Sequence, residues 1–254
     1  MCVVNFLGNF TALPAAFKHH NTYCSYADTI MPQFFFAVGF AYRLTFLRRM
    51  AGASVNSVCA RFLWRNLKLI GLGAALYLGG AAAHTWTGSS PPSVAAFLAR
   101  AWRQELFQTL VHIGVTALWI LPVIGSGAWM RLAFAGGSAA LHLGLSGWFY
   151  YDWVNAEHGI DGGPLGFLTW TIPMIAGSLA HDILARGTEA RAAVRPLLVW
   201  GCVVMALGYT LSCLNRITPP NIPASTSPGA WLAEPPFVPP THPVNLWTMS
   251  QRAG

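Results

Sequence analysis

Residues 71–83 read GLGAALYLGGAAA and residues 199–211 read VWGCVVMALGYTL, so both stretches are apolar on every face of a helix. A helix needs about 20 such residues to cross the hydrocarbon layer of a bilayer. A membrane barrel would instead show segments of about ten residues with alternating apolar and polar side chains. The apolar runs of the chain are 28–47, 66–83, 106–124, 131–149, 165–184 and 197–214. The sequence therefore predicts an all-α, polytopic transmembrane helix bundle with about six near-complete helices.

The composition also favours a membrane over water as the main solvent. Of the 254 residues, 9% are charged and 54% are hydrophobic, whereas soluble domains carry about 25% charged residues. The apolar runs are also separated from one another by charged, Pro or Gly-Ser segments, as expected of consecutive membrane helices. We therefore expect a multi-pass integral membrane protein, with the inner (plasma) membrane of a bacterium as its location.

The basic residues have an uneven distribution along the chain, which has a formal net charge of +7. If the helices alternate in direction, ten of the 15 Lys and Arg residues fall on one side, which the positive-inside rule makes cytoplasmic. These ten are Arg43, Arg48, Arg49, Arg61, Arg65, Lys68, Arg131, Arg186, Arg191 and Arg195. No basic groove with interleaved aromatic residues points to nucleic acid, so we expect membrane lipids as partners and no nucleic acid.

The two ends of the chain indicate a fragment of one membrane domain, residues 1–254. The apolar stretch 1–7 is too short to span a bilayer and lacks the charged n-region of a signal peptide. We expect the start of the first helix and the C-terminal helices to be missing. Within the domain, nine of the 25 residues in 219–243 are Pro, which predicts an extended external loop. Residues 93–104 are amphipathic and predict a short helix along the membrane surface.

Polar residues are few, and they gather around the first predicted loop. Histidine titrates near neutral pH and serves as a general base or nucleophile, which makes His19 and His20 candidates. Asp28 follows them and can orient an imidazole. Helix capping explains Asp28 equally well, and His19 and His20 also suit a solvated loop. No spacing typical of a structural zinc site occurs, so we expect no metal.

His112 and His142 lie inside apolar runs. Helix packing is the usual explanation of a histidine in such a place, and ligation of haem or binding of a quinone is the less common one.

Three short motifs occur in order near the start of the chain: VVNFLG at 3–8, FKH at 17–19 and ADTIMPQFFFAVG at 27–39. Their order and spacing resemble the start of the heparan-α-glucosaminide N-acetyltransferase-like family of membrane acyltransferases. Far downstream, PVNLWTMS at 243–250 is similar to that family's P-V-N-K-x-L-W-T-x-S. Two departures concern acceptor recognition: the family's W-N-G after the histidine is absent, and so is the Lys of the second motif.

The resemblance implies a membrane acyltransferase that uses acetyl-CoA from the cytoplasm and acetylates an amine or hydroxyl acceptor, an amino sugar or glycan, on the outer face. His19 becomes the catalytic imidazole, and His20 replaces it if the loop differs by one residue. Asn5 would orient the imidazole or the acetyl carbonyl, and Asp28 would hold the geometry. The implied substrate-binding residues are Asn245, Trp247, Thr248 and Ser250.

Several alternatives stay open at this point. Both an acetyl-histidine intermediate and general-base catalysis suit His19. A transporter of small molecules or glycan precursors would use the same polar helix mouths, and a redox protein would depend on the two histidines in the apolar runs. A structural membrane subunit would depend on none of these residues. A homodimer also stays open.

Overall fold

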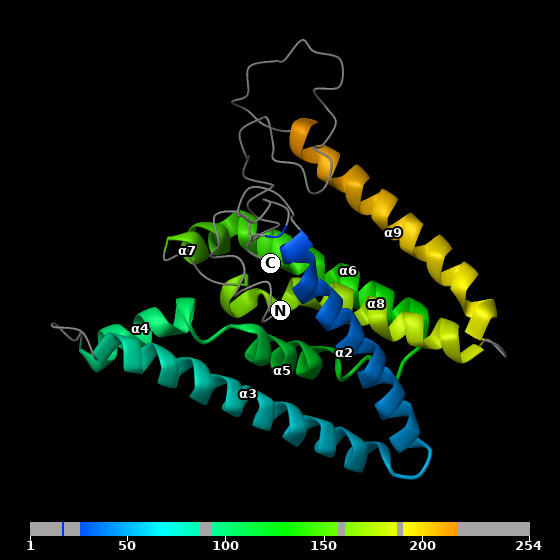
Figure 1. Cartoon of the computed structure of the whole chain (residues 1–254), viewed down its shortest axis with the longest axis horizontal. Helices are drawn as coiled ribbons and strands as arrows, with labels where there is room; N and C mark the ends of the chain where they lie inside the picture. The colour runs from blue at the N-terminus through cyan, green and yellow to red at the C-terminus, as the bar shows by residue number, and fades with distance from the viewer. Residues whose placement is uncertain (1–16, 18–25, 87–92, 157–160, 187–189, 218–254) are drawn as a thin grey trace. The chain divides into compact units, whose positions relative to one another are not determined.

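The computed structural model describes residues 17, 26–86, 93–156, 161–186 and 190–217, and Figure 1 draws their helices. Every regular element in this part of the chain is helical, which confirms the all-α prediction. A π-helical turn, η2 (Ser146–Tyr150), follows α6, and a 3-10 turn, η3 (Gly163–Leu165), precedes α8. The α-helices are α2 (Tyr26–Met50), α3 (Val55–Trp86), α4 (Val94–Gln104), α5 (Thr109–Ile120), α6 (Ala128–Leu145), α7 (Tyr151–Asn155), α8 (Phe167–Arg186) and α9 (Ala190–Ile217).

Three of these helices are long and apolar enough to cross a membrane: Tyr26–Met50, Val55–Ala83 and Val194–Leu211. They indicate an integral membrane protein. The other predicted runs are helical as well, but α5 has only 12 residues and α6 has 18 before the π-turn begins at Ser146. The prediction of six near-complete spans goes beyond the three long helices, and it stays a prediction.

The described residues divide into two compact units. One contains residues 26–33, 182–186 and 190–217, so most of its ordered structure is α9, whose residues 194–211 form an apolar segment. The other contains residues 34–86, 93–156 and 161–181 and includes the larger set of helices. We call it the helix bundle, and the buried polar residues described below lie within it.

Helix α2 is continuous through Pro32, as the sequence predicted for residues 28–47. Pro32 lies close enough to the helix start that few backbone hydrogen bonds are lost. The next phenylalanines spread over different faces: Phe35 is fully buried, whereas Phe34 and Phe36 are 50% and 41% exposed. One face of α2 therefore packs in the bundle, and the other faces are left to the surroundings.

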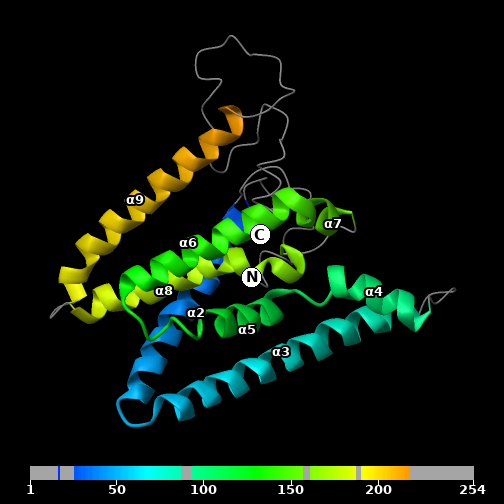
Figure 2. The same ribbon diagram turned by 180° about the vertical axis from the view of Figure 1, so that it is seen from behind.

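Helices α3 and α5 lie side by side and run in opposite directions, as Figures 1 and 2 show from two sides. Near the start of α5, the Tyr77 hydroxyl of α3 accepts a hydrogen bond of 3.1 Å from the Leu110 N–H. Further along, a Cβ on Gly114 would lie 3.1 Å from the Asn66 carbonyl oxygen. The glycine therefore lets the backbones of the two helices approach closely.

Helices α2 and α8 cross at two glycines. A Cβ added to Gly39 would lie 1.9 Å from the Met174 carbonyl oxygen, and one added to Gly177 would lie 1.9 Å from that of Phe36. Neither position has room for a side chain, because the obstructing atoms belong to the backbone. Small residues at helix crossings allow this close packing between apolar helices.

Helix α4 confirms the helix predicted at residues 93–104. The Ser93 side chain accepts a hydrogen bond of 3.3 Å from the Ala96 N–H and caps its start. Phe97 and Ala101 are buried on one face, as expected of an amphipathic helix.

Candidate functional site

Of the site residues predicted from the sequence, the structure describes Asp28 alone. Asp28 lies in the first turn of α2 and is partly buried. This place at the helix start suits both a catalytic carboxylate and a charge that stabilises the helix N-terminus. The other predicted residues lie outside the described part of the chain: Asn5, His19, His20, Asn245, Trp247, Thr248 and Ser250. The structure therefore does not test whether these residues come together.

The helix bundle contains a second group of polar residues that the sequence only partly revealed. They follow one face of α6 and the π-turn after it, at intervals of seven, four, four and four residues, which repeat on one face of a helix. All are at most 6% exposed. We call them the α6 polar stripe, and its members are Arg131, Ser138, His142, Ser146 and Tyr150.

Arg131 lies at one end of the α6 polar stripe. From the sequence this residue was counted as one of the basic charges on the cytoplasmic side, yet its side chain is 0% exposed in the bundle. Its Nη1 donates a hydrogen bond of 2.7 Å to the Ser178 Oγ of α8. That hydroxyl in turn donates to the Ile175 carbonyl oxygen at 2.6 Å. A buried cation is costly in an apolar environment, so its hydrogen bonds are needed to keep it there.

Ser138 occupies the middle of the stripe and joins three helices. Its Oγ accepts a hydrogen bond of 3.0 Å from the Trp119 indole of α5 and donates one of 2.9 Å to the Leu168 carbonyl oxygen of α8. Together with the contact of Arg131 with Ser178, these bonds set α6 and α8 side by side in opposite directions. The stripe thus lies between α5, α6 and α8.

Tyr150 ends the stripe at the loop before α8. Its hydroxyl donates to the Gly162 carbonyl oxygen and accepts a hydrogen bond of 2.8 Å from the Leu165 N–H. The loop has left-handed backbone angles at Asp161, Gly162 and Gly163, with φ of 54°, 86° and 63°. Burial raises the pKa of the Tyr150 phenol to about 12, and its hydrogen bond with the Leu165 backbone opposes part of the rise. Tyr150 is therefore a neutral donor at physiological pH.

Helix α5 contributes two more buried polar side chains, His112 and Thr116, which we call the His112 pair. They are one helical turn apart and both are 0% exposed. Among the described residues, neither ring nitrogen of His112 has a well-aligned hydrogen-bond partner, although the Phe107 backbone lies near the ring, and Thr116 Oγ1 has no partner. The His112 ring packs beside Phe107 and Trp170, at centroid distances of 5.8 Å and 6.5 Å. Buried polar atoms without partners are rare in proteins, and they call for an explanation such as a bound polar molecule.

A contrasting group of buried polar residues, the Tyr42 network, lies where α2, α3 and α5 meet. The Tyr42 hydroxyl accepts a hydrogen bond of 2.9 Å from Asn66 Nδ2 and donates one of 2.9 Å to the Ala117 carbonyl oxygen. Ala117 lies in the last turn of α5, where carbonyl groups lack partners within the helix. The network pairs the Tyr42 hydroxyl, the Asn66 amide nitrogen and one carbonyl group at the end of α5.

The described residues hold no cluster of three or more His, Cys, Asp or Glu side chains that would suit a metal ion. His112 and His142 are both buried in the bundle, a position that suits helix packing as well as ligation of a redox group. Cys59 and Cys202 are free thiols.

Sequence reasoning found the two histidines of the bundle and missed most of the polar residues around them. Both histidines were noted because they interrupt apolar runs. The regular spacing of Arg131, Ser138 and His142 would have shown that they share a face of the helix. The hydrogen bonds to Trp119 and Ser178 come from other helices, and nothing in the sequence spacing indicates them.

Comparison with known proteins adds no relative: no family model, no curated protein and no solved structure matches the chain. The family resemblance of the short motifs remains a prediction.

Proposed function

We propose that the chain is part of a membrane acyltransferase that moves an acetyl group from cytoplasmic acetyl-CoA to an amine or hydroxyl acceptor, an amino sugar or glycan, on the outer face. The observation that carries the proposal is the ordered set of motifs at 3–8, 17–19 and 27–39, with the related motif at 243–250. The structure supports it at one point, because Asp28 of the third motif lies in the first turn of an apolar helix long enough to cross a membrane.

In the proposed reaction, His19 removes the proton of the acceptor amine or hydroxyl as that group attacks the thioester carbonyl. The new bond joins the acceptor nitrogen or oxygen to the acetyl carbon, the carbon–sulfur bond breaks, and coenzyme A leaves as the thiol after taking up a proton. Asn5 orients the imidazole or the acetyl carbonyl, and Asp28 fixes the geometry. Acceptor contacts come from Asn245, Trp247, Thr248 and Ser250, and no metal takes part.

The distribution of charge gives the proposed orientation. The Lys and Arg residues at the end of α2 and the start of α3 face the cytoplasm, which leaves the start of α2 and its preceding histidines on the outer side. In a bacterium the membrane would be the inner one. A polar route through the apolar bundle is needed for a reaction that uses reactants from both sides. The α6 polar stripe supports this, since its polar residues extend from Arg131 to Tyr150, at opposite ends of α6 and η2.

A transporter for small molecules or glycan precursors is the second candidate, and the same stripe favours it. Buried polar residues in membrane helices mark the paths of substrates and ions in many transporters. The two functions differ in chemistry, because only the acyltransferase releases coenzyme A.

The test is to compare His19→Ala with His20→Ala in the reconstituted full-length protein. Loss of a positioned general base costs about 10²–10⁴-fold in rate, so we expect His19→Ala to abolish acetyl transfer and His20→Ala to weaken it less. Coenzyme A release is measured with acetyl-CoA and a panel of amino-sugar acceptors, and the melting temperatures of both variants must match that of the parent.

The opposite pattern, with activity lost only in His20→Ala, would move the catalytic assignment by one residue. Full activity in both variants would remove the loop from the chemistry. Uptake of an amino sugar into vesicles without any release of coenzyme A would favour the transporter.

A further inference from the structure

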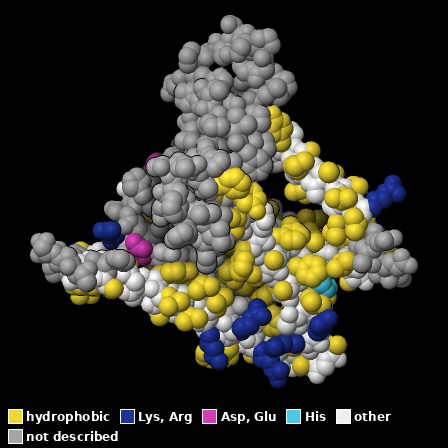
Figure 3. Space-filling view, in the orientation of Figure 1, with side chains coloured by type: hydrophobic (Ala, Val, Ile, Leu, Met, Phe, Trp, Pro, Cys, Tyr) yellow, Lys and Arg dark blue, Asp and Glu magenta, His cyan; other side chains and the backbone are white. Residues whose placement is uncertain are grey.

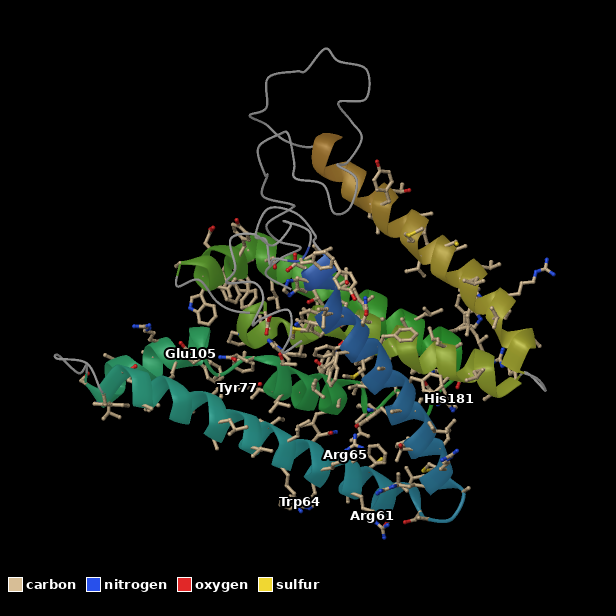
Figure 4. The ribbon with its side chains drawn as sticks, viewed as in Figure 1. Arg61, Trp64, Arg65, Tyr77, Glu105 and His181 are labelled. Atoms are coloured by element: carbon tan, nitrogen blue, oxygen red, sulfur yellow. The ribbon has the colours of Figure 1, made fainter. Side chains whose placement is uncertain are left out.

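A basic face on α3 points to a function that the acetyl-transfer chemistry does not require. Arg61, Trp64, Arg65 and Lys68 form one continuous patch of the helix surface, because Arg61 and Lys68 each lie three or four residues from both Trp64 and Arg65. All four are exposed, and Trp64 is 63% exposed. Figure 4 shows Arg61 and Trp64 on the side of α3 away from α5, and Figure 3 shows Lys and Arg gathered on this part of the bundle.

The Arg65 guanidinium is held in place by aromatic rings. Its Cζ lies 5.1 Å from the ring centroid of Tyr42 and 4.8 Å from that of Phe62. Stacking of this kind fixes the plane of the group and leaves its edge N–H donors available to an anion. No carboxylate among the described residues forms an ion pair with Arg61, Arg65 or Lys68.

Two grooves meet on this face. The first, of about 580 Å³, is lined by Ser57, Ala60, Arg61, Trp64, Arg65 and Lys68. The second, of about 410 Å³, shares Arg65 and Lys68 and continues along the apolar side chains of Leu69, Leu72 and Ile113. Charged donors at one end and apolar walls at the other match a molecule with an anionic head and a hydrocarbon chain.

The length of α3 places the basic face at the edge of a membrane. The helix has 32 residues, or roughly 48 Å at 1.5 Å per residue, whereas the hydrocarbon layer is about 30 Å thick. Its uncharged part starts after Lys68, and residues 69–86 cover roughly 27 Å. The basic first part of α3 therefore extends beyond the hydrocarbon, to the depth of phospholipid headgroups.

We propose that this face binds an anionic phospholipid, with its phosphate on Arg61, Arg65 and Lys68 and an acyl chain along Leu69, Leu72 and Ile113. Trp64 lies at the interface, where tryptophan is enriched in membrane proteins. A soluble phosphate compound would use the same cations and would gain little from the apolar part of the groove. The proposal requires only that α3 spans the membrane and is independent of acetyl transfer.

The experiment measures retention of phosphatidylglycerol by the purified chain, using native mass spectrometry after exchange into mixed micelles of phosphatidylglycerol and phosphatidylcholine. Arg65→Gln/Lys68→Gln is expected to lower the retained phosphatidylglycerol on the order of tenfold or more, because each basic residue near the surface adds attraction for anionic lipid. Arg48→Gln at the exposed end of α2, outside both grooves, is the matched control; it also removes one positive charge, and it should lower retention far less than Lys68→Gln does.

Three further arms make the test decisive. Lys68→Gln alone guards against a folding defect, because Arg65 and not Lys68 stacks on the Tyr42 and Phe62 rings, and it should lower retention several-fold. Leu72→Trp fills the apolar groove and should lower retention while the cations stay intact. Inorganic phosphate and coenzyme A, each at millimolar concentration, should fail to displace the lipid.

Equal retention of phosphatidylglycerol in the parent and in the double variant would overturn the proposal. So would full displacement by coenzyme A or inorganic phosphate, which would identify the face as a site for a soluble phosphate compound. Loss of acetyl transfer in His19→Ala with unchanged lipid retention would separate this proposal from the proposed function.

Discussion

Helix α5 takes part in two groups of buried polar atoms that are satisfied to very different degrees. In the Tyr42 network, the Asn66 amide donates to the Tyr42 hydroxyl, which donates to the Ala117 carbonyl oxygen. In the His112 pair, on the same helix, neither side chain has a well-aligned hydrogen-bond partner among the described residues. Satisfied groups stabilise a fold, whereas unsatisfied ones cost stability. We therefore interpret the Tyr42 network as structural and propose a functional role for the His112 pair.

The largest effect should come from a variant that forces α2 and α8 apart. Gly177→Val would force a side chain against the Phe36 carbonyl, where an added Cβ already lies at 1.9 Å. Overpacking costs about 1–3 kcal/mol and occasionally more, and the obstructing atom here belongs to the backbone, so we expect a large loss of melting temperature in detergent. Gly144→Val is the control, because nothing lies within 4 Å of a Cβ there. Equal melting temperatures for the two variants would contradict the close crossing of α2 and α8.

The structural role of the Tyr42 network is tested by Asn66→Leu. This change removes the donor to the Tyr42 hydroxyl in a buried place and should lower the stability by about 1–3 kcal/mol. Asn56→Leu, at an exposed position of α3, should change little. Thermal unfolding followed by circular dichroism measures both. The folded fraction of Asn66→Leu should keep its activity, and a specific loss of activity would assign the network a functional role.

A third variant concerns the satisfied end of the α6 polar stripe. Tyr150→Phe leaves the Leu165 N–H and the Gly162 carbonyl without their partner, at a cost of about 1–2 kcal/mol. The parent should lose stability as the pH rises above 10, because the unfolded chain releases the phenol proton near pH 10 while the native state holds it to about pH 12.

Tyr150→Phe lacks this phenol, so its melting temperature should fall less steeply between pH 9 and pH 11. Tyr209→Phe at an exposed position of α9 is the control for the pH series. Identical slopes for the parent and Tyr150→Phe would show that the Tyr150 phenol is not protected from ionisation.

The smallest effect on stability is expected for His112→Leu, and this variant distinguishes a functional role of the His112 pair from a structural one. Leucine replaces an imidazole that has no well-aligned hydrogen bond to lose within the described residues, so the stability should change by no more than about 1 kcal/mol. Acetyl transfer or transport should fall by about tenfold or more if the pair holds a polar reactant or water. A loss of about 3 kcal/mol with unchanged activity would make His112 a structural residue, like Asn66.

The positions of the helices could be predicted from the sequence, and the buried polar contacts could not. The apolar run 28–47 predicted a helix, and the structure has one with slightly wider bounds, Tyr26–Met50. An apolar run of this length is predictable as a helix because the backbone of a membrane segment must satisfy its own hydrogen bonds. Arg131 was predicted only as a topological charge. Its burial depends on Ser178, 47 residues away, and such contacts between helices follow from packing rather than from local pattern.

The excess length of α3 has a consequence for the thickness of the surrounding bilayer. Tilt alone would have to reach about 50° to fit a helix of roughly 48 Å into a slab of about 30 Å, beyond the observed range of about 0–40°. If α3 crosses the membrane, the basic segment before residue 69 therefore projects from the slab. A thicker bilayer would draw Lys68 toward the hydrocarbon at a cost in charge desolvation, and a thinner one would expose apolar residues. Hydrophobic mismatch thus leads us to expect that a membrane-spanning α3 favours bilayers of one thickness.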